Sequence, residues 1–327
     1  MRTDPFTPRR ILAVINESHG QLALRSAIEV ASNHGADLDV LACVEPPRDI
    51  GLIARLSGSD ADTIVKKLVA QTRATITERL QKVCPDRAIT PYVAAGKPFL
   101  EVIRHVAEAG CDLVIKAAEP LTSVNRFLFA STDQHLLRKC PCPVWLQTPT
   151  APVSPKRIIA AIDLDLWDAA EPETLTDLNR QVVNVARALA NVPDAQVIVL
   201  HAWDAIGEGL VWAFTTGKNA RLSADRYVNE VLDARLKAMN AFMASINGPD
   251  SNAKHLVVPK LVRGAPEEVI EAQSRMLNAD LVVMGTVART GISGIFIGNT
   301  AENIINSLGC PILAVKPEGF VSPVLRS

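Results

Sequence analysis

The sequence repeats itself, and this repeat constrains the fold more than any other feature. The segment Pro8–Asn16 (PRRILAVIN) resembles Pro155–Asp163 (PKRIIAAID), which lies 147 positions later. From Gly96 and its counterpart Gly264 onward, the two copies align without a gap at an offset of 168 residues. The chain is therefore a tandem duplication, and each copy must fold into a similar unit.

A proline-rich segment separates the copies. Residues 148–155 (TPTAPVSP) contain three prolines, which disfavour both helices and sheet hydrogen bonds. We therefore predict a first domain at residues 1–147, a linker at 148–155 and a second domain at 156–327. The offsets predict two longer loops in the second copy, one around residues 164–174 and one before Gly264.

Short apolar runs alternate with longer amphipathic stretches in each copy. Continuously apolar strands are typical of a parallel sheet that helices cover on both faces. The predicted fold class is therefore α/β, with two tandem, doubly wound, Rossmann-like parallel sheets. In the second copy we expect strands at 158–162, 197–202, 256–261, 280–284 and 312–315, and helices at 175–189, at 228–246, from 266 and from 301.

The composition excludes several classes of protein. Lys+Arg 34 against Asp+Glu 35 gives a net charge of −1, so a dedicated nucleic-acid binder is not expected. No apolar run has the length of a membrane span, and the N-terminus lacks an apolar signal core. The six cysteines form no CxxC pair. The sequence therefore predicts a soluble, cytoplasmic protein without a membrane partner.

Candidate binding residues follow the strands of the second copy. In a doubly wound sheet, ligands bind outside the carboxyl ends of the strands, which directs attention to Asp163, Ala202 and the glycine-rich segment 285–302. Asn299 and Glu302 have the spacing of a capping box, and a helix start is a site for anions. Alternatively, these glycines only make turns, because neither a Walker A nor a GxGxxG pattern is present.

These segments resemble the universal stress protein family. The similarity lies in Gly264–Pro266, Asp280–Met284, Cys310–Val315 and the loop, whose family pattern is Gly, two residues, Gly, nine residues, Gly, then Ser or Thr. It covers the chain twice and is greatest to the tandem, E-type members. The resemblance implies two domains of the adenine-nucleotide alpha hydrolase type, paired within one chain as a pseudo-dimer through Val144–Gln147 and Ile312–Val315. A homodimer of two such chains stays open.

The resemblance also implies roles for individual residues. Asp163 would contact the nucleoside of ATP, and the Ala202 backbone would approach the adenine. The residues that would hold the phosphates of Mg-ATP are Gly285, Gly298, Asn299 and Thr300. Ala288 departs from the family pattern, which has glycine there, and a Cβ at positive φ would cost about 1 kcal/mol or more.

The first copy has lost this pattern. Ala117, Pro120, Ala130 and Ser131 stand at the loop positions, and Asn16 replaces the acid after the first strand. We therefore expect the first domain to bind no ATP and to serve as a structural partner.

Other residues carry weaker signals. Cys140 and Cys142 have no second cysteine pair or neighbouring histidine, so we predict buried thiols and no metal site. His201 is either a structural histidine or, less expected, a catalytic base. Arg235 is expected on a solvated helix face. The tryptophans either line an apolar cavity or pack the longer loops onto the domain; they are Trp167, Trp203 and Trp212.

The function predicted from the sequence is that of a non-enzymatic stress-response protein that binds ATP or a related phosphorylated ligand in the second domain. No catalytic residues are assigned, although the resemblance leaves slow ATP hydrolysis open. The alternatives are an interaction protein without a nucleotide function and a carrier of a phosphorylated apolar ligand. The protein partner is not predicted.

Overall fold

The computed structural model describes residues 5–16, 20–119, 131–166, 169–215, 219–246, 256–286 and 298–326. We call the residues through 147 the first half and those from 156 the second half. The elements of the first half are β1 (Arg10–Ile15), α1 (Gln21–His34), β2 (Asp37–Val44), α2 (Ile50–Ser57), α3 (Ala61–Val83), β3 (Tyr92–Ala95), α4 (Pro98–Ala109), β4 (Leu113–Ala117), α5 (Ser131–Lys139) and β5 (Val144–Gln147).

The second half follows the same order of elements. They are β6 (Arg157–Ala161), α6 (Pro172–Leu189), β7 (Gln196–Trp203), α7 (Glu208–Phe214), α8 (Ala220–Ile246), β8 (Leu256–Arg263), α9 (Pro266–Met276), β9 (Leu281–Gly285), α10 (Asn299–Ser307), β10 (Ile312–Val315) and a final 3-10 turn at Pro323–Arg326. Each strand and helix expected in the second copy is present, with ends that differ by a few residues, except that α8 begins eight residues before the expected 228.

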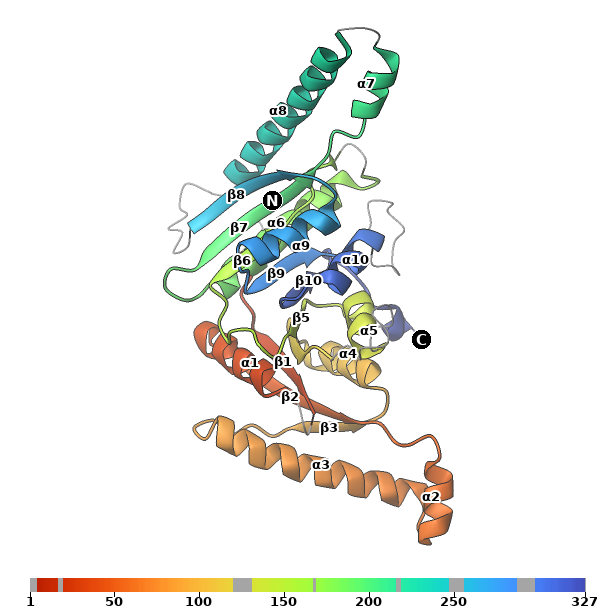
Figure 1. Ribbon diagram of the computed structural model, residues 1–327. Helices are drawn as coiled ribbons and strands as arrows, with labels where there is room; N and C mark the ends of the chain where they lie inside the picture. The colour runs from red at the N-terminus through yellow and green to blue at the C-terminus, as the bar shows by residue number, and fades with distance from the viewer. Residues whose placement is uncertain are drawn as a thin grey trace.

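The strands of the two halves form one continuous sheet of ten strands within the described residues (Figure 1). Their order is β3-β2-β1-β4-β5-β10-β9-β6-β7-β8. Neighbouring strands are parallel within each half, whereas β5 and β10 pair antiparallel, with Trp145 opposite Leu313. The expected pseudo-dimer through the last strands is confirmed.

Helices cover both faces of this sheet, which explains why the strands are apolar on both sides. One face packs against α1, α3, α6 and α8, and the other against α4, α5, α9 and α10. In each half the first strand lies between the fourth and the second, so the chain changes direction at β1/β4 and at β6/β9. These two switch points are where ligands bind in doubly wound sheets.

Hydrogen bonds tie the linker to the junction of the halves. Gln147 Nε2 donates to Ser26 Oγ at 3.0 Å and to the Pro152 carbonyl at 2.9 Å. Ser26 Oγ donates to the Val153 carbonyl at 2.9 Å, and Trp145 Nε1 donates to Gln147 Oε1 at 3.1 Å. The polar groups of the buried Gln147 and Ser26 are thereby satisfied in a position that holds the linker against α1.

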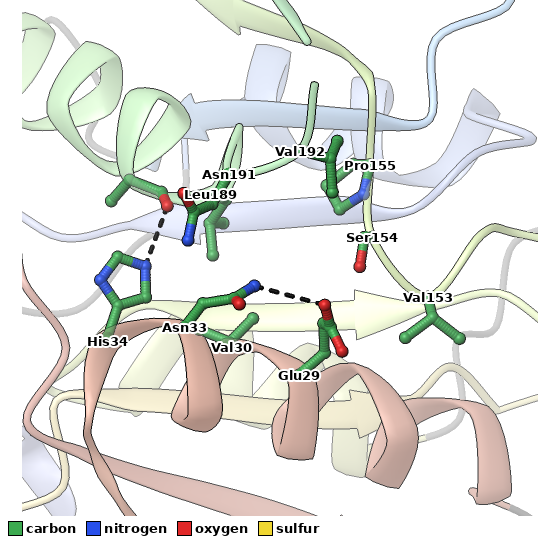
Figure 2. Close-up of a pocket in the computed structure, with 11 residues that line it drawn as sticks. Glu29, Val30, Asn33, His34, Val153, Ser154, Pro155, Leu189, Asn191 and Val192 are labelled. Carbon is green, nitrogen blue, oxygen red and sulfur yellow. Dashed lines mark hydrogen bonds between the residues drawn. The ribbon is translucent and has the colours of Figure 1, made fainter. Parts of the chain in front are cut away.

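A second contact between the halves lies beyond this network. Figure 2 shows His34 at the end of α1 directed toward the end of α6, where its Nε2 lies 3.0 Å from the carbonyl oxygen of Ala188. Asn33, directly before His34, and Glu29, about one turn earlier, line the same small cavity beside Ser154 of the linker. The linker is therefore a packed part of the junction.

Two helical arms extend at opposite ends of the sheet, α2–α3 beside β3 and α7–α8 beside β8 (Figure 1). The helix α8 is buried at its start, through Ala220 and Ala224, and near its end, through Met239, Phe242 and Met243, whereas Leu236 is 43% exposed. The apolar stripe expected along 228–246 is therefore only partly core. The arms expose Leu52, Ile53, Leu56, Leu210, Trp212 and Phe214.

Among the described residues, no helix combines the length and the continuous apolar character that a membrane span requires.

Candidate functional site

The predicted residues of the second half lie at the carboxyl ends of neighbouring strands. Asp163 follows β6, Ala202 lies near the end of β7, and Gly285 ends β9. Since β6 pairs with both β9 and β7, these residues flank the switch point of this half. The predicted position at this edge of the sheet is therefore reproduced for Asp163, Ala202 and Gly285. Ala288 lies outside the described residues.

Asp163 is held by a reciprocal pair of hydrogen bonds with α6. Its N–H donates to Asn179 Oδ1 at 3.1 Å, and Asn179 Nδ2 donates to the Asp163 carbonyl at 2.7 Å. One oxygen of the Asp163 carboxylate accepts from the Asp165 N–H at 3.0 Å. The turn after β6 is thereby fixed, with Asp163 half-buried at the strand end.

Arg235 of α8 reaches this turn, which sequence analysis did not predict. Its Nη2 lies 2.6 Å from Asp165 Oδ1, and both side chains are largely buried, at 14% and 11% exposure. The expectation of a solvated Arg235 is wrong, because the long loop after β6 brings a carboxylate under α8. A basic residue on the otherwise apolar side of a helix was the available signal.

His201 is buried beside the same carboxylate. Its Nδ1 lies 3.3 Å from the Ile162 carbonyl oxygen and its Nε2 3.9 Å from Asp165 Oδ1. Burial lowers the pKa of His201, although Asp165 and Asp163 oppose this shift. A neutral, 1%-exposed imidazole among backbone groups fits the structural interpretation better than that of a catalytic base.

Gly285 and Gly298 lie at the two described ends of the glycine-rich loop. A Cβ on Gly285 would lie 2.6 Å from Leu178 Cδ2, so close packing of α6 requires glycine here. Gly298 donates its N–H to the Thr286 carbonyl at 3.2 Å and is the N-cap of α10. Both glycines therefore have a structural role at this edge, whether or not a ligand is bound.

The capping box predicted at Asn299 and Glu302 is wrong, because the N-cap of α10 is Gly298, one residue before Asn299. The helix begins at Asn299, so Asn299 and Thr300 occupy its first turn instead of preceding it. Glu302 forms an ion pair with Arg138 of α5 in the other half. Because Gly298 is the cap, the first N–H groups of α10 have no side-chain acceptor from the cap residue.

Lys316 is a buried cation close to this loop that sequence analysis missed. It directly follows β10, and its Nζ donates to Thr286 Oγ1 at 2.7 Å. Burial lowers the pKa of Lys316 to about 7. In the sequence, the only local indication that Lys316 is buried was its place directly after an apolar strand.

The equivalent edge of the first half has different chemistry. Lys116 Nζ donates to Asp133 Oδ1 at 2.8 Å and to Glu119 Oε1 at 3.1 Å. The other Asp133 oxygen accepts from the Glu119 N–H at 2.7 Å, at the start of α5. A carboxylate of the chain therefore lies in the first turn of α5, where a bound anion would experience repulsion. The offset of 168 places Met284 and Ala301 at these positions in the second half.

A cavity of about 810 Å³ lies beside this edge of the first half. Its described lining comes from the start of α1, the ends of β4 and β5, and the segment between α10 and β10. The charged residues of that lining are Arg25, Arg79, Glu119 and Asp133. The described predicted residues of the second half do not contribute to it.

The tryptophans do not gather around one cavity in the described part of the chain. Trp203 is 5% exposed, with the Arg263 guanidinium 5.9 Å from its ring centre, whereas Trp212 is 47% exposed on α7. Trp167 lies outside the described residues. Trp203, buried at the end of β7, is therefore better explained by packing than by the lining of a cavity.

Comparisons with known proteins agree with this architecture. The family model described as the universal stress protein family matches residues 7–147 and 156–316. Universal stress protein E of Escherichia coli strain K12 is 33% identical over 230 residues, which cover 70% of this chain and 68% of that protein. Universal stress protein E of Photorhabdus laumondii is 26% identical over 345 residues, which cover 97% of both chains.

Solved structures share the fold over nearly the whole chain. The functionally unknown protein PA1789 of Pseudomonas aeruginosa PAO1 aligns with a TM-score of 0.64 at 24% identity, covering 95% of this chain and 93% of that chain. A universal stress protein of Archaeoglobus fulgidus aligns with a TM-score of 0.58 at 16% identity, covering 95% and 97%. With two matched segments that together span most of its length, the chain belongs to the universal stress protein family.

Proposed function

We propose that the second half binds the phosphates of an adenine nucleotide, as Mg-ATP, at the switch point between β6 and β9. The observation that carries this proposal is the convergence of Asp163, Gly285 and the glycine-capped start of α10 at one edge of the sheet. A helix start with unpaired N–H groups attracts phosphate, and a carboxylate after the first strand suits a nucleoside hydroxyl.

The difference between the halves supports this assignment. In the first half, Asp133 and Glu119 bring carboxylates to the start of α5, and Asn16 follows β1. In the second half, Ala301 and Asp163 stand at the positions of Asp133 and Asn16. Phosphate is therefore favoured in the second half, and the expected stoichiometry is one nucleotide per chain.

The protein would act as a non-enzymatic ligand sensor in the stress response. Nucleotide binding would act on the start of α10, and α10 contacts the other half through the Glu302–Arg138 ion pair. A ligand at the loop can thereby change the junction of the halves, which gives a partner protein something to recognise.

A pair of matched variants tests the location. Asp163→Asn keeps the hydrogen bond from Asp165 but removes the charge, and Asn16→Ala changes the equivalent position in the first half. We expect Asp163→Asn to weaken Mg-ATP binding roughly 10- to 100-fold in titration calorimetry, the effect of losing one charged hydrogen bond. Asn16→Ala should leave the affinity unchanged.

Native mass spectrometry supplies the stoichiometry. One added nucleotide mass per wild-type chain is the expected result. Binding that Asn16→Ala weakens and Asp163→Asn does not would place the ligand at the switch point of the first half. No nucleotide mass at any Mg-ATP concentration would favour an interaction protein, with the exposed side chains of α7 as its contact surface.

A further inference from the structure

Three side chains of the types that bind metals meet at the amino-end edge of the sheet, opposite the nucleotide edge. Asp39 lies in β2, His105 in α4, and Cys111 directly before β4. Their ligand atoms all lie within 4.8 Å of one another. His105 Nε2 lies 2.9 Å from Asp39 Oδ2, and Cys111 Sγ lies 3.8 Å from the same oxygen.

The group is largely buried, and its His105 and Asp39 side chains remain partly exposed. The Asp39 and His105 side chains are 23% and 15% exposed, and Cys111 is 5% exposed. The ring of Tyr92 lies 5.1 Å from the ring of His105, so the imidazole is supported on one side. The His105 imidazole thus contacts both the Tyr92 ring and Asp39 Oδ2.

Two of the three separations between ligand atoms are close to those of a tetrahedral zinc site. With usual Zn–N, Zn–O and Zn–S bonds, the ligand atoms would lie about 3.3 Å apart for N and O, and about 3.6 Å apart for S and either partner. The observed 2.9 Å for His105 and Asp39 and 3.8 Å for Cys111 and Asp39 differ from these by only a few tenths of an ångström. An ion would also bring His105 Nε2 and Cys111 Sγ, which lie within 4.8 Å of each other, to about 3.6 Å.

The nearest cation does not close the site. Arg10 Nη1 lies 3.6 Å from Asp39 Oδ2, while its Nη2 already bonds Asp37 at 3.1 Å. The Arg10 side chain is 37% exposed and can keep Asp37 as its partner when an ion binds Asp39. The second Asp39 oxygen adds a further ligand position.

The second half offers an internal comparison. An offset of 159 residues, which relates β2 to β7, places Ile198 at the position of Asp39. The offset of 168 places Gln273 and Ala279 at the positions of His105 and Cys111. None of these three is a good ligand for a soft or borderline cation. The three ligand types therefore occur together in only one of two otherwise equivalent positions, at a place where the fold alone does not require them.

We propose that Asp39, His105 and Cys111 bind one Zn²⁺ ion, with a water molecule as the fourth ligand. Nitrogen, sulfur and oxygen donors in a tetrahedral set suit Zn²⁺ better than Mg²⁺ or Ca²⁺, which prefer oxygen alone. The ion would join α4 to the starts of β2 and β4. It is independent of the nucleotide site, which lies at the other edge.

Cobalt spectroscopy on the full-length, chelator-treated protein tests this proposal. Co²⁺ should produce a thiolate-to-metal charge-transfer band and tetrahedral visible bands, and one equivalent of Zn²⁺ should remove both. Cys111→Ser should abolish the charge-transfer band. His105→Gln, which introduces the side chain of the second half, should weaken Zn²⁺ binding by at least about 100-fold.

Cys142→Ser is the matched control, because Cys142 lies near Cys111 at the start of the next strand. Its charge-transfer band should match that of the wild type. The proposal is overturned if wild-type protein shows no band, if the band survives in Cys111→Ser, or if Cys142→Ser loses it. Should Cys111→Ser not fold, the His105→Gln titration decides, and unchanged Zn²⁺ affinity there contradicts the site.

Discussion

At the scale of single residues, Lys316 is the most unusual charge near the glycine-rich loop. Its Nζ is buried against Thr286 Oγ1 and lies 5.1 Å from the centre of the Phe320 ring. Burial lowers the pKa of Lys316 from 10.5 to about 7, because the ammonium group loses its hydration. Between these two values the unfolded chain carries one proton more than the folded protein.

The stability of the protein should therefore rise with pH between about 7 and 10.5 through this residue. Below pH 7 both states are protonated, and the full cost of burying the charge is present. Lys316→Met should raise the free energy of unfolding at pH 7 and flatten its rise toward pH 10.5. Urea unfolding across this pH range measures both effects. A variant less stable than wild type at pH 7 would show that the ammonium group is net stabilising.

At the scale of elements, the starts of α5 and α10 distinguish the halves. The Asp133 carboxylate occupies the first turn of α5 and binds both Lys116 and the Glu119 N–H. In the second half, Ala301 takes the equivalent position, and the cap is Gly298. One helix start carries a carboxylate of the chain in its first turn, while the cap of the other is a glycine without a side chain.

Variants of the Lys116–Asp133 ion pair measure how the start of α5 contributes to stability. Lys116→Met alone should lower the free energy of unfolding by about 3–5 kcal/mol, because it leaves a buried carboxylate without its cation. Adding Asp133→Asn should recover most of this loss, since the new amide oxygen still accepts from the Glu119 N–H. Chemical unfolding of the single and double variants provides the comparison. A double variant as unstable as the single one would contradict this account.

At the scale of the whole molecule, the antiparallel pairing of β5 and β10 makes one sheet from two repeats. Trp145 is completely buried at this seam, opposite Leu313, and Gln147 connects the seam to α1 and the linker. The halves are therefore joined by packed strands as well as by the covalent chain.

Breaking the linker should leave the halves together. Two co-expressed fragments, residues 1–150 and 151–327, should co-purify as one complex, because the strand pairing and the buried Trp145 remain. Trp145→Ala should separate them or weaken the complex by several kcal/mol, the usual cost of removing a buried tryptophan. Size-exclusion chromatography distinguishes these results. Intact fragments that elute separately would show that the linker is what holds the halves together.

Much of this architecture was predictable because it depends on local patterns. Apolar runs of strand length and the repeat offsets indicated the order of the elements, and family resemblance indicated the pairing of the last strands. The start of α10 was misplaced by one residue, because Gly298 and Asn299 are both acceptable caps. Arg235 was assigned to solvent because its partner Asp165 is 70 positions away and lies on a long loop.

The sequence by itself determined the duplication, the parallel sheet of each repeat and the edge at which Asp163 and Gly285 lie, since these follow from periodicity and strand direction. Only the tertiary structure decided which side chains meet. Asp39 and Cys111, 72 positions apart, come together because β2 and β4 are the two strands that flank β1. Strand order is a property of the whole packed sheet, so no local pattern of residues contains it.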